Sequence, residues 1–463
     1  MIKLDSRGFR LGFATFVLFT GLAGEAWRNS ISWYGFGAVV AIVVTLTAIV
    51  LVRNRHSVRW GSLPFPLLAF LGFATVSIAW SYYPGYTTLG AVLQTLNAAA
   101  AITLAVTLTW SEILLALGVA IRIILGLSFA FEFVVAAFVR HPIFPVWVVP
   151  DDPKHPAALL YWSRDLLFSS AKIQGIVGNS SLLAMVALIG VIVFALQVAN
   201  RSVSRFWGLF WLLVALITVA ITKSATIIVA LVVVTVVAAV ILLKRRARTA
   251  AKRRRTSIGL GIGVLGLVAT ALVLHAPLLN ALGKNSTLTG RTHIWQAVIG
   301  LAEKRPAVGW GWLSYWVVWI EPFKNLVSAG GVQVAHAHNA WLDVWLQLGI
   351  VGLVLFIILV FSTLVRCWSI ANDTIISGPR RAGYYSWVSL LPLLVLVAQL
   401  IQSIAESRIL IEGGWMLLVL WAVKTKLDPV AQDESAALAA AAARPAGRLP
   451  RTTLPLAHPP AGT

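Results

Sequence analysis

Long apolar stretches alternate with short polar ones over almost the whole chain. A stretch of about 20 apolar residues is long enough to cross the hydrocarbon core of a membrane as a helix. Such segments occur near residues 9–27, 33–52, 63–80, 87–109, 112–138, 176–199, 205–222, 224–243, 257–275, 343–366, 384–404 and 410–424. The least distinct boundary lies at Thr222-Lys223-Ser224. The pattern predicts an all-α, polytopic membrane protein with about 12 transmembrane helices.

Composition supports this prediction. Hydrophobic residues make up 59% of the chain, charged residues only 11%, and the mean hydropathy is +0.87. Soluble domains contain about a quarter charged residues, so a water-soluble globule is excluded. The single cysteine, Cys367, excludes an intramolecular disulfide and a cysteine-based zinc site.

The net charge of +21 is distributed in a way that predicts membrane orientation. Basic residues concentrate in alternate loops, as expected when those loops face the cytoplasm. Both termini are then cytoplasmic. No aromatic interleaving or nucleic-acid module accompanies the charge, so we expect no nucleic-acid partner. The basic loops contain Arg53, Arg55 and Arg59; Arg201 and Arg205; Lys244 to Arg255; Arg366, Arg380 and Arg381; and Lys424 and Lys426.

The same topology predicts one integral membrane domain over residues 1–426 and a disordered cytoplasmic tail over residues 427–463, which are rich in Ala and Pro. Two polar loops, at about 139–175 and 276–342, fall outside the cell membrane. The first becomes amphipathic near Leu159–Ser169, which predicts a helix lying on the membrane surface. The second is a long loop rich in Trp, and long loops between packed elements tend to be functional or disordered. We interpret it as an ordered reaction chamber.

Arg291 is the first candidate site residue in this chamber. The apolar positions that follow it, including Ile294 and Val298, predict an amphipathic helix with Arg291 in its first turn. A helix N-terminus attracts anions, and Arg adds bidentate recognition of phosphate. The alternative is an interfacial Arg that binds lipid headgroups. Further along, Trp310 and Trp312 would either stack on sugar rings or anchor the loop at the membrane interface.

His338 is the second candidate, directly before the predicted helix near 343–366. A neutral imidazole there can take a proton from a sugar hydroxyl. Asn339 would cap the helix or orient the imidazole. Structural roles are the alternative for His338, and His336 is expected to be a bystander. Arg408, with Glu406, would face the chamber or form a local ion pair.

Four motifs in this order resemble the O-antigen ligase and polymerase superfamily, bacterial membrane glycosyltransferases with a large extracytoplasmic loop. Upstream, Lys172 stands in a Lys-x-x-Gly stretch where the family has Arg. Lys223 neighbours Ala225, the position at which the family usually has Arg. The resemblance covers roughly residues 170–420. The motifs are Gly290-Arg291-Thr292-x-Ile294-Trp295, Pro306-x-x-Gly309-x-Gly311, His338-Asn339-x-x-Leu342 and Gly349-x-x-Gly352.

The resemblance implies a bacterial plasma-membrane enzyme that moves a glycan from a polyprenyl phosphate or diphosphate carrier to a glycan, glycolipid or protein acceptor. Arg291 with Lys223 and Lys172 would hold the carrier phosphates, next to Gly290. His338 would activate the acceptor hydroxyl. The resemblance implies no nucleotide, metal or other cofactor.

Two alternatives belong to other classes. A transporter or flippase of lipid-linked glycans would mark its midplane with broken helices, intramembrane charges and internal repeats. Here intramembrane charge is sparse, with Arg122 and Glu132 nearer the ends of their predicted helix. A non-catalytic protein that only binds lipid-linked glycan is the other alternative.

Overall fold

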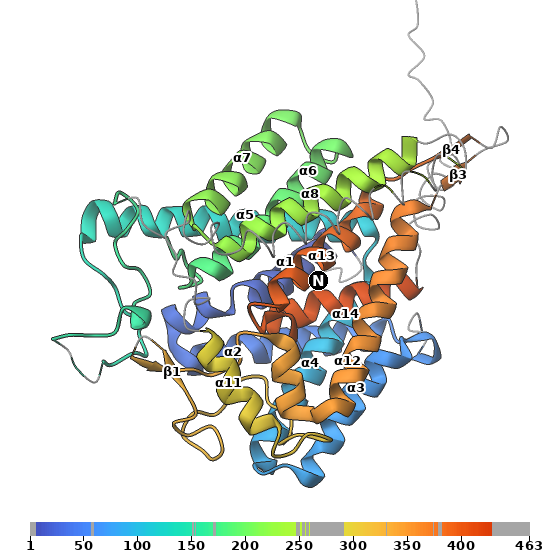
Figure 1. The fold of residues 1–463 in the computed structure, drawn as a ribbon. Coiled ribbons are helices and arrows are strands. Elements are labelled where there is room, and N and C mark those ends of the chain that lie inside the picture. The colour runs from blue at the N-terminus through green and yellow to red at the C-terminus, as the bar shows by residue number, and fades with distance from the viewer. Residues whose placement is uncertain are drawn as a thin grey trace, which may run out of the picture.

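A computed structural model describes residues 6–427, apart from 57–59, 151, 153, 170–172, 247–250, 252–254, 256–258, 260–290, 330, 374 and 378–381. Helices dominate (Figure 1). The α-helices are α1 (Arg7–Leu22), α2 (Gly24–Arg53), α3 (Phe65–Val76), α4 (Pro84–Thr107), α5 (Trp110–Val134), α6 (Ser180–Ala199), α7 (Arg205–Ile221), α8 (Ala225–Arg246), α11 (Arg291–Ala302), α12 (Ala340–Asn372), α13 (Leu391–Ser403) and α14 (Glu412–Leu427). The short strands form two antiparallel pairs, β1 (Ser328–Ala329) with β2 (Val332–Gln333) and β3 (Ile375–Ser377) with β4 (Ala382–Tyr384).

The predicted apolar segments coincide with helices wherever the structure describes them. The segment near 257–275 and the tail at 428–463 lie outside the described residues. Among the described helices, six are long and apolar enough to cross a membrane: Gly24–Arg53, Pro84–Thr107, Trp110–Val139, Ser180–Ala199, Ala225–Arg246 and Ala340–Asn372. Shorter apolar helices occupy Phe65–Trp80, Arg205–Ile221 and Val388–Ser403. The fold is therefore that of a mostly helical, multi-pass membrane protein, with six spans rather than twelve supported by helix length.

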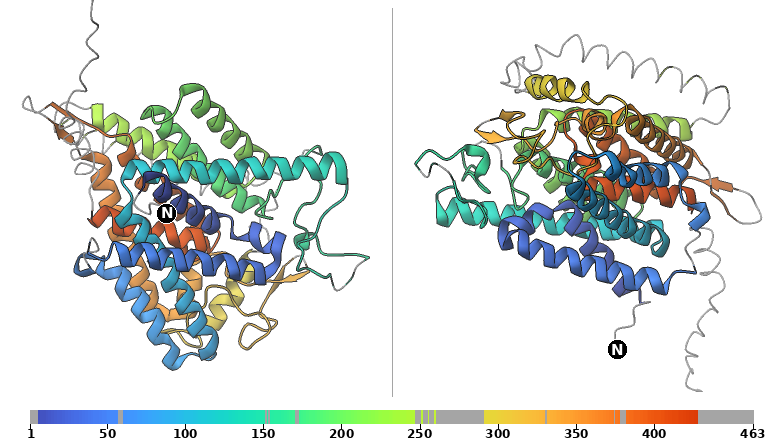
Figure 2. Two further views of the ribbon diagram at one scale, coloured as in Figure 1. Left: turned by 180° about the vertical axis from the view of Figure 1, so that it is seen from behind. Right: turned by 90° about the horizontal axis from the view of Figure 1, so that it is seen from below.

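The helix ends fall into two groups at opposite ends of the body. Figure 1 shows the chain after α5, together with β1, at one end and the β3–β4 hairpin at the other. Figure 2 shows α5 crossing the back of the body beside α1. At the hairpin end, the Lys424 ammonium group donates a hydrogen bond to the Leu108 carbonyl (2.7 Å). Loops predicted to lie outside the membrane thus share one end, which we call the loop end.

The loop-end segment 291–342 has a small hydrophobic core of its own. The buried face of α11 contributes Ile294 and Val298, which pack with Trp310, Trp316 and Phe323 from the chain that follows. The prediction of an amphipathic helix after Gly290 is therefore confirmed, and Arg291 stands in the first turn of that helix. A buried core of this kind holds the segment in one arrangement on α12, which α11 packs against.

A kink in α12 fixes this segment to the helix. At Gly349 the backbone has a φ of 64°, so the helix is interrupted there. The backbone groups that the interruption leaves unpaired bond to the chain at 306–311 instead. Gly311 N–H donates to the Gln347 carbonyl (2.9 Å), and Ile350 N–H donates to the Pro306 carbonyl (2.8 Å). The motifs Pro306-x-x-Gly309-x-Gly311 and Gly349-x-x-Gly352 are thus hydrogen-bonded to each other through their backbones, an arrangement that we call the joint.

Replacing Gly349 by Ala should destabilise the protein by about 1–3 kcal/mol, since the residue would be held at positive φ against the Ala307 backbone. Thermal unfolding of the detergent-solubilised protein measures the change. Gly300→Ala is the matched control, because that helical glycine faces open space. It should be neutral or stabilise by up to about 1 kcal/mol. Equal melting temperatures for Gly349→Ala and wild type would contradict the joint.

The other loop-end segment, near 140–179, differs from its prediction. Leu159–Ser169 is not an α-helix; only Ala158–Leu160 forms a 3-10 turn. Ser163 instead pairs with Ile143 as an isolated bridge. The Glu132 carboxylate accepts hydrogen bonds from the Ser163 hydroxyl (2.8 Å) and the Gln174 backbone N–H (2.8 Å). These bonds hold the segment extended, so its amphipathic pattern serves packing on α5 rather than a surface helix.

Candidate active site

The Glu406 side chain gathers the two principal candidates into one cluster. Arg291 Nη2 donates to Glu406 Oε1 (2.7 Å), and His338 Nδ1 donates to Glu406 Oε2 (2.9 Å). Arg291 comes from α11, His338 from the residues before α12, and Glu406 from the residues after α13. The three side chains are mostly but not wholly buried, at 18%, 28% and 11% exposed. They form a partly buried polar cluster at the loop end.

The local backbone explains how His338 reaches Glu406. Asn339 caps α12, since its side-chain oxygen accepts hydrogen bonds from Trp341 N–H (3.0 Å) and Leu342 N–H. His338, directly before the cap, has a φ of 49°, a conformation that few side-chain-bearing residues adopt. The capping role weighed for Asn339 is thus present in the structure.

Asp343, one turn into α12, connects the segment before α12 to the segment after α13, which carry His338 and Glu406. Its carboxylate accepts hydrogen bonds from the Ala337 backbone N–H (3.0 Å) and from the Ser407 hydroxyl. Ala337 precedes His338 and Ser407 follows Glu406. One buried carboxylate therefore sets the spacing of the His338–Glu406 pair.

Glu406 is an anion at any physiological pH. Burial alone would raise its pKa, but the hydrogen bond from His338 and the positive charge of Arg291 outweigh burial and lower the pKa to about 2. A permanent carboxylate on Nδ1 fixes the proton of a neutral His338 on that nitrogen. The lone pair of the ring then lies on Nε2, where it is available to a substrate hydroxyl.

His336 lies against His338, with ring centroids 4.0 Å apart. His336 Nδ1 accepts a hydrogen bond from the His338 backbone N–H (3.2 Å). Burial and then the charge of His338 lower the pKa of His336 well below its ordinary value. His336 is therefore a neutral ring packed into the cluster. We expected it to be a bystander, but it contacts His338 directly.

The residues His336, His338 and Glu406 also have a spacing that suits a metal ion, with ligand atoms within 4.8 Å of one another. Two contacts weigh against this use. His336 Nδ1 already accepts a backbone hydrogen bond, and the charge of Glu406 is already balanced by Arg291. We interpret the trio as an acid–base cluster.

Protonation of His336 provides a test of this packing. The unfolded chain binds a proton at the ordinary pKa of about 6.5, whereas the folded chain does not, so stability is complete above pH 6.5 and falls below it. The slope should approach about 1.4 kcal/mol per pH unit. Thermal unfolding at pH 7.5 and 5.5 measures it. His336→Asn should remove this part of the slope, and His293→Asn, an exposed control, should keep it. An unchanged slope in His336→Asn would contradict the neutral ring.

A second ionic cluster surrounds Arg408. Arg408 Nη1 donates to the Tyr315 hydroxyl (2.7 Å), and its Nη2 lies 3.5 Å from Glu25 Oε1. Arg28 pairs with Glu25 (2.9 Å) and with Glu412 (2.5 Å). The Tyr315 ring in turn packs edge-on against His336, at 6.4 Å between centroids. The two clusters are therefore continuous. Arg408 pairs with Glu25 and Glu412. The alternative prediction of a local ion pair between Arg408 and Glu406 is therefore wrong.

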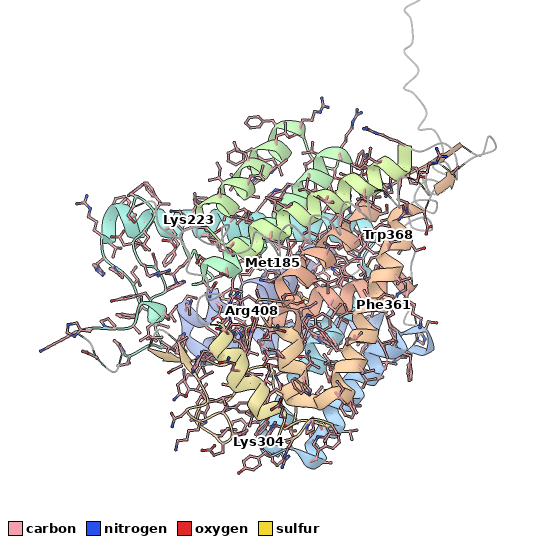
Figure 3. The ribbon with its side chains drawn as sticks, in the orientation of Figure 1. Met185, Lys223, Lys304, Phe361, Trp368 and Arg408 are labelled. Atoms are coloured by element: carbon pink, nitrogen blue, oxygen red, sulfur yellow. The ribbon has the colours of Figure 1, made fainter. Side chains whose placement is uncertain are left out.

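The remaining predicted site residues lie elsewhere. Lys172 and Gly290 fall outside the described residues. Lys223 is exposed in the turn between α7 and α8, with a φ of 50°, and lies apart from Arg408 (Figure 3). Trp310 is 9% exposed and hydrogen-bonded to the Leu301 carbonyl, while Trp312 is fully buried edge-on to Phe70. Both indoles are thus core residues, which corrects their prediction as platforms for sugar stacking: neither ring has a free face.

Sequence reasoning missed most of the second cluster. Glu25 and Arg28 stand three residues apart at the start of α2, a spacing of opposite charges that could have indicated this pair. Their partner Glu412 is 384 residues from Arg28, so no local pattern indicated it. Tyr315 had no signal of its own in the Trp-rich stretch.

The fold and the site define a class: a multi-pass helical membrane protein with a His–Glu–Arg cluster beneath an ordered loop-end segment. Residues 210–357 match the O-antigen ligase family model. The chain is also 35% identical over 118 residues to the exopolysaccharide production protein ExoQ of Rhizobium meliloti (strain 1021). The aligned stretch makes up 24% of this chain and 27% of that protein. These matches confirm the resemblance to the O-antigen ligase and polymerase superfamily. The chain thus spans about a quarter of the length of the curated relative it matches.

Proposed function

We propose that the protein is a glycan ligase or polymerase of cell-surface polysaccharide assembly. It transfers a glycan from a polyprenyl phosphate or diphosphate carrier to an acceptor hydroxyl on the outer face of the membrane. The observation that carries this proposal is the Glu406 carboxylate, which holds Arg291 and His338 on its two oxygens. Support comes from the family match, whose residues include Arg291 and His338, and from the similarity to an exopolysaccharide production protein.

His338 acts as the general base. The acceptor oxygen attacks the anomeric carbon of the donor sugar, the bond from that carbon to the phosphate oxygen breaks, and its electron pair leaves with the phosphate. The acceptor proton passes to His338 Nε2, while Glu406 stabilises the imidazolium that forms. A positioned base of this kind contributes about 100- to 10,000-fold to a rate.

Arg291 holds the carrier phosphate. A guanidinium has five N–H donors, and the hydrogen bond to Glu406 uses one of them. The others can stabilise the charge that develops on the leaving phosphate. Lys172, and Lys223 in the turn between α7 and α8, would add positive charge, and Arg408 would orient the glycan. A glycan, glycolipid or protein would serve as acceptor. No metal takes part in this mechanism, because Arg291 supplies the cation.

A deletion strain distinguishes transfer from its rival, translocation of the lipid-linked glycan. Loss of a ligase or polymerase leaves donor on the outer leaflet, where a glycosidase added to intact cells digests it. Loss of a flippase leaves donor on the inner leaflet, protected from the enzyme. We expect surface polysaccharide to disappear or shorten and digestible donor to accumulate. Protected donor would support the flippase instead, and an unchanged glycan with no accumulation would support a role in binding only.

A further inference from the structure

A cavity of about 290 Å³ lies between α1, α2 and α4, at the hairpin end of the body. Its volume is close to the lower limit for sites that bind small molecules, about 300–1,000 Å³. Figure 2 shows α1 and α2 side by side. The other end of α4 meets the loop-end segment, where Tyr82 N–H donates to the Trp310 carbonyl (3.1 Å). Because α4 has 24 residues and is about 36 Å long, the cavity is separate from the cluster at Glu406.

The wall of this cavity carries one unbalanced positive charge. Arg10 and Arg53 both line it. Arg10 pairs with Glu112 on α5 (2.7 Å), and the Glu112 carboxylate also accepts the Thr109 backbone N–H (3.0 Å). Arg53 stands at the end of α2, and its guanidinium has no ion pair or hydrogen bond among the described residues. Two arginines thus face one carboxylate, and a ligand with a single negative charge would restore neutrality.

Two side-chain oxygens beside the arginines can accept hydrogen bonds. The Asn54 side-chain amide donates to the Val50 carbonyl (2.9 Å), and the Thr107 hydroxyl donates to the Thr103 carbonyl (2.7 Å). Both side chains line the cavity, and within the part of the chain that the structure describes neither side-chain oxygen accepts a hydrogen bond. A ligand that carries hydroxyl groups next to its negative charge therefore matches this wall.

The rest of the lining is apolar and lies further from the helix ends. It consists of Phe9, Phe13, Val50 and Val106, and the rings of Phe9 and Phe13 stack with centroids 6.4 Å apart. Phe13 and Val50 lie about one helical turn deeper than the two arginines. The cavity is thus charged at the helix ends and apolar toward the membrane interior. A phospholipid has its groups in this order, whereas a small water-soluble anion does not.

We propose that this cavity binds the headgroup of a monoanionic phospholipid that carries hydroxyl groups, of the phosphatidylglycerol type. The phosphate pairs with Arg53 in the field of Arg10, and the glycerol hydroxyls donate to Asn54 and Thr107. The acyl chains follow the apolar residues into the membrane. Basic pockets between membrane helices on the cytoplasmic side bind anionic headgroups, and the basic loops predict that this end is cytoplasmic. The lipid is a bound component of the protein, and no bond in it changes.

Arg53→Gln tests the charged part of the site. The full-length protein in mixed micelles receives phosphatidylglycerol or zwitterionic phosphatidylcholine with the same acyl chains, and native mass spectrometry measures the affinity for the first bound lipid. We expect wild type to bind phosphatidylglycerol about tenfold more tightly than phosphatidylcholine, and Arg53→Gln to lose this preference. The melting temperature without phosphatidylglycerol should not change, since the Arg53 guanidinium has no partner among the described residues.

Arg205→Gln is the matched control for charge. Arg205 belongs to another basic loop, is exposed at the start of α7 and does not line the cavity. Its loss should leave the affinity for phosphatidylglycerol within about twofold of wild type, since salt screens exposed charges that do not touch the lipid. Equal losses in Arg53→Gln and Arg205→Gln overturn the proposal, because they indicate general attraction by the basic loops. So does a wild type without the preference, or an Arg53→Gln variant that keeps it.

Phosphatidylmethanol tests the hydroxyl part, because it has the charge of phosphatidylglycerol without the hydroxyls. Wild type should bind phosphatidylglycerol about fivefold more tightly than phosphatidylmethanol, and Thr107→Val should reduce this difference. Thr45→Val, an exposed residue in the middle of α2 with the same bond to its own helix (2.8 Å to the Ala41 carbonyl), should keep it. Equal affinities of wild type for the two lipids, or no effect of Thr107→Val, overturn the proposal. Displacement of phosphatidylglycerol by an equal concentration of inorganic phosphate overturns the lipid as the source. Each readout is binding, so the result is independent of glycan transfer.

Discussion

His338→Ala should transfer glycan about 1,000-fold more slowly than wild type, with an unchanged melting temperature. The reason is that Nε2 of this ring receives the acceptor proton, and the Glu406 carboxylate, hydrogen-bonded to Nδ1, orients the ring. Water cannot replace a base held in place by a hydrogen bond. Initial rates in proteoliposomes supplied with lipid-linked donor measure the effect.

His293→Ala is the matched control for this variant. His293 stands on α11, two residues after Arg291, and its side chain is exposed. Its loss should leave the rate within about twofold of wild type, since a surface substitution of this kind disturbs little. A His338→Ala enzyme as active as His293→Ala would remove His338 from the mechanism.

Arg291→Ala should lower the rate about 100- to 1,000-fold, the range seen when one stabilising donor is removed from a developing charge. It should also raise the KM for donor, because the phosphate would lose a bidentate partner. Arg291→Lys should recover only part of the activity, since an ammonium group cannot form paired hydrogen bonds in one plane. The readouts are kcat and the KM for donor.

Lys304→Ala controls for loss of positive charge at the same end of the protein. Lys304 is exposed just after α11, at the edge of the body (Figure 3). Its removal should change neither constant beyond about twofold. A loss of activity in Lys304→Ala equal to that of Arg291→Ala would indicate a general electrostatic effect rather than a phosphate site.

The helices could be predicted from sequence because backbone groups in a membrane must pair within their own segment. An apolar run of sufficient length therefore indicates a helix regardless of its neighbours. The same reasoning placed Arg291 in the first turn of α11, where burial of Ile294 and Val298 follows the predicted face. The prediction of a surface helix near Leu159–Ser169 was wrong, because Glu132 on α5 accepts a hydrogen bond from Ser163 and holds that segment extended.

The site was only half predictable for a related reason. Arg291 and His338 carry local motifs, but Glu406 joins them over sequence separations of 115 and 68 residues. Trp310 and Trp312 looked like ligand platforms because indoles serve both roles, and only packing against Leu301 and Phe70 identifies them as core. Long-range pairing of charges and burial of aromatic rings depend on the folded arrangement, which apolar periodicity does not specify.

The most direct test measures both products of a single reaction. Purified protein in liposomes receives lipid-linked donor and acceptor in the presence of a metal chelator. Our account predicts one polyprenyl phosphate or diphosphate released for each glycan joined to the acceptor, at a rate that His338→Ala nearly abolishes. Movement of intact donor between leaflets without release of the carrier would contradict it.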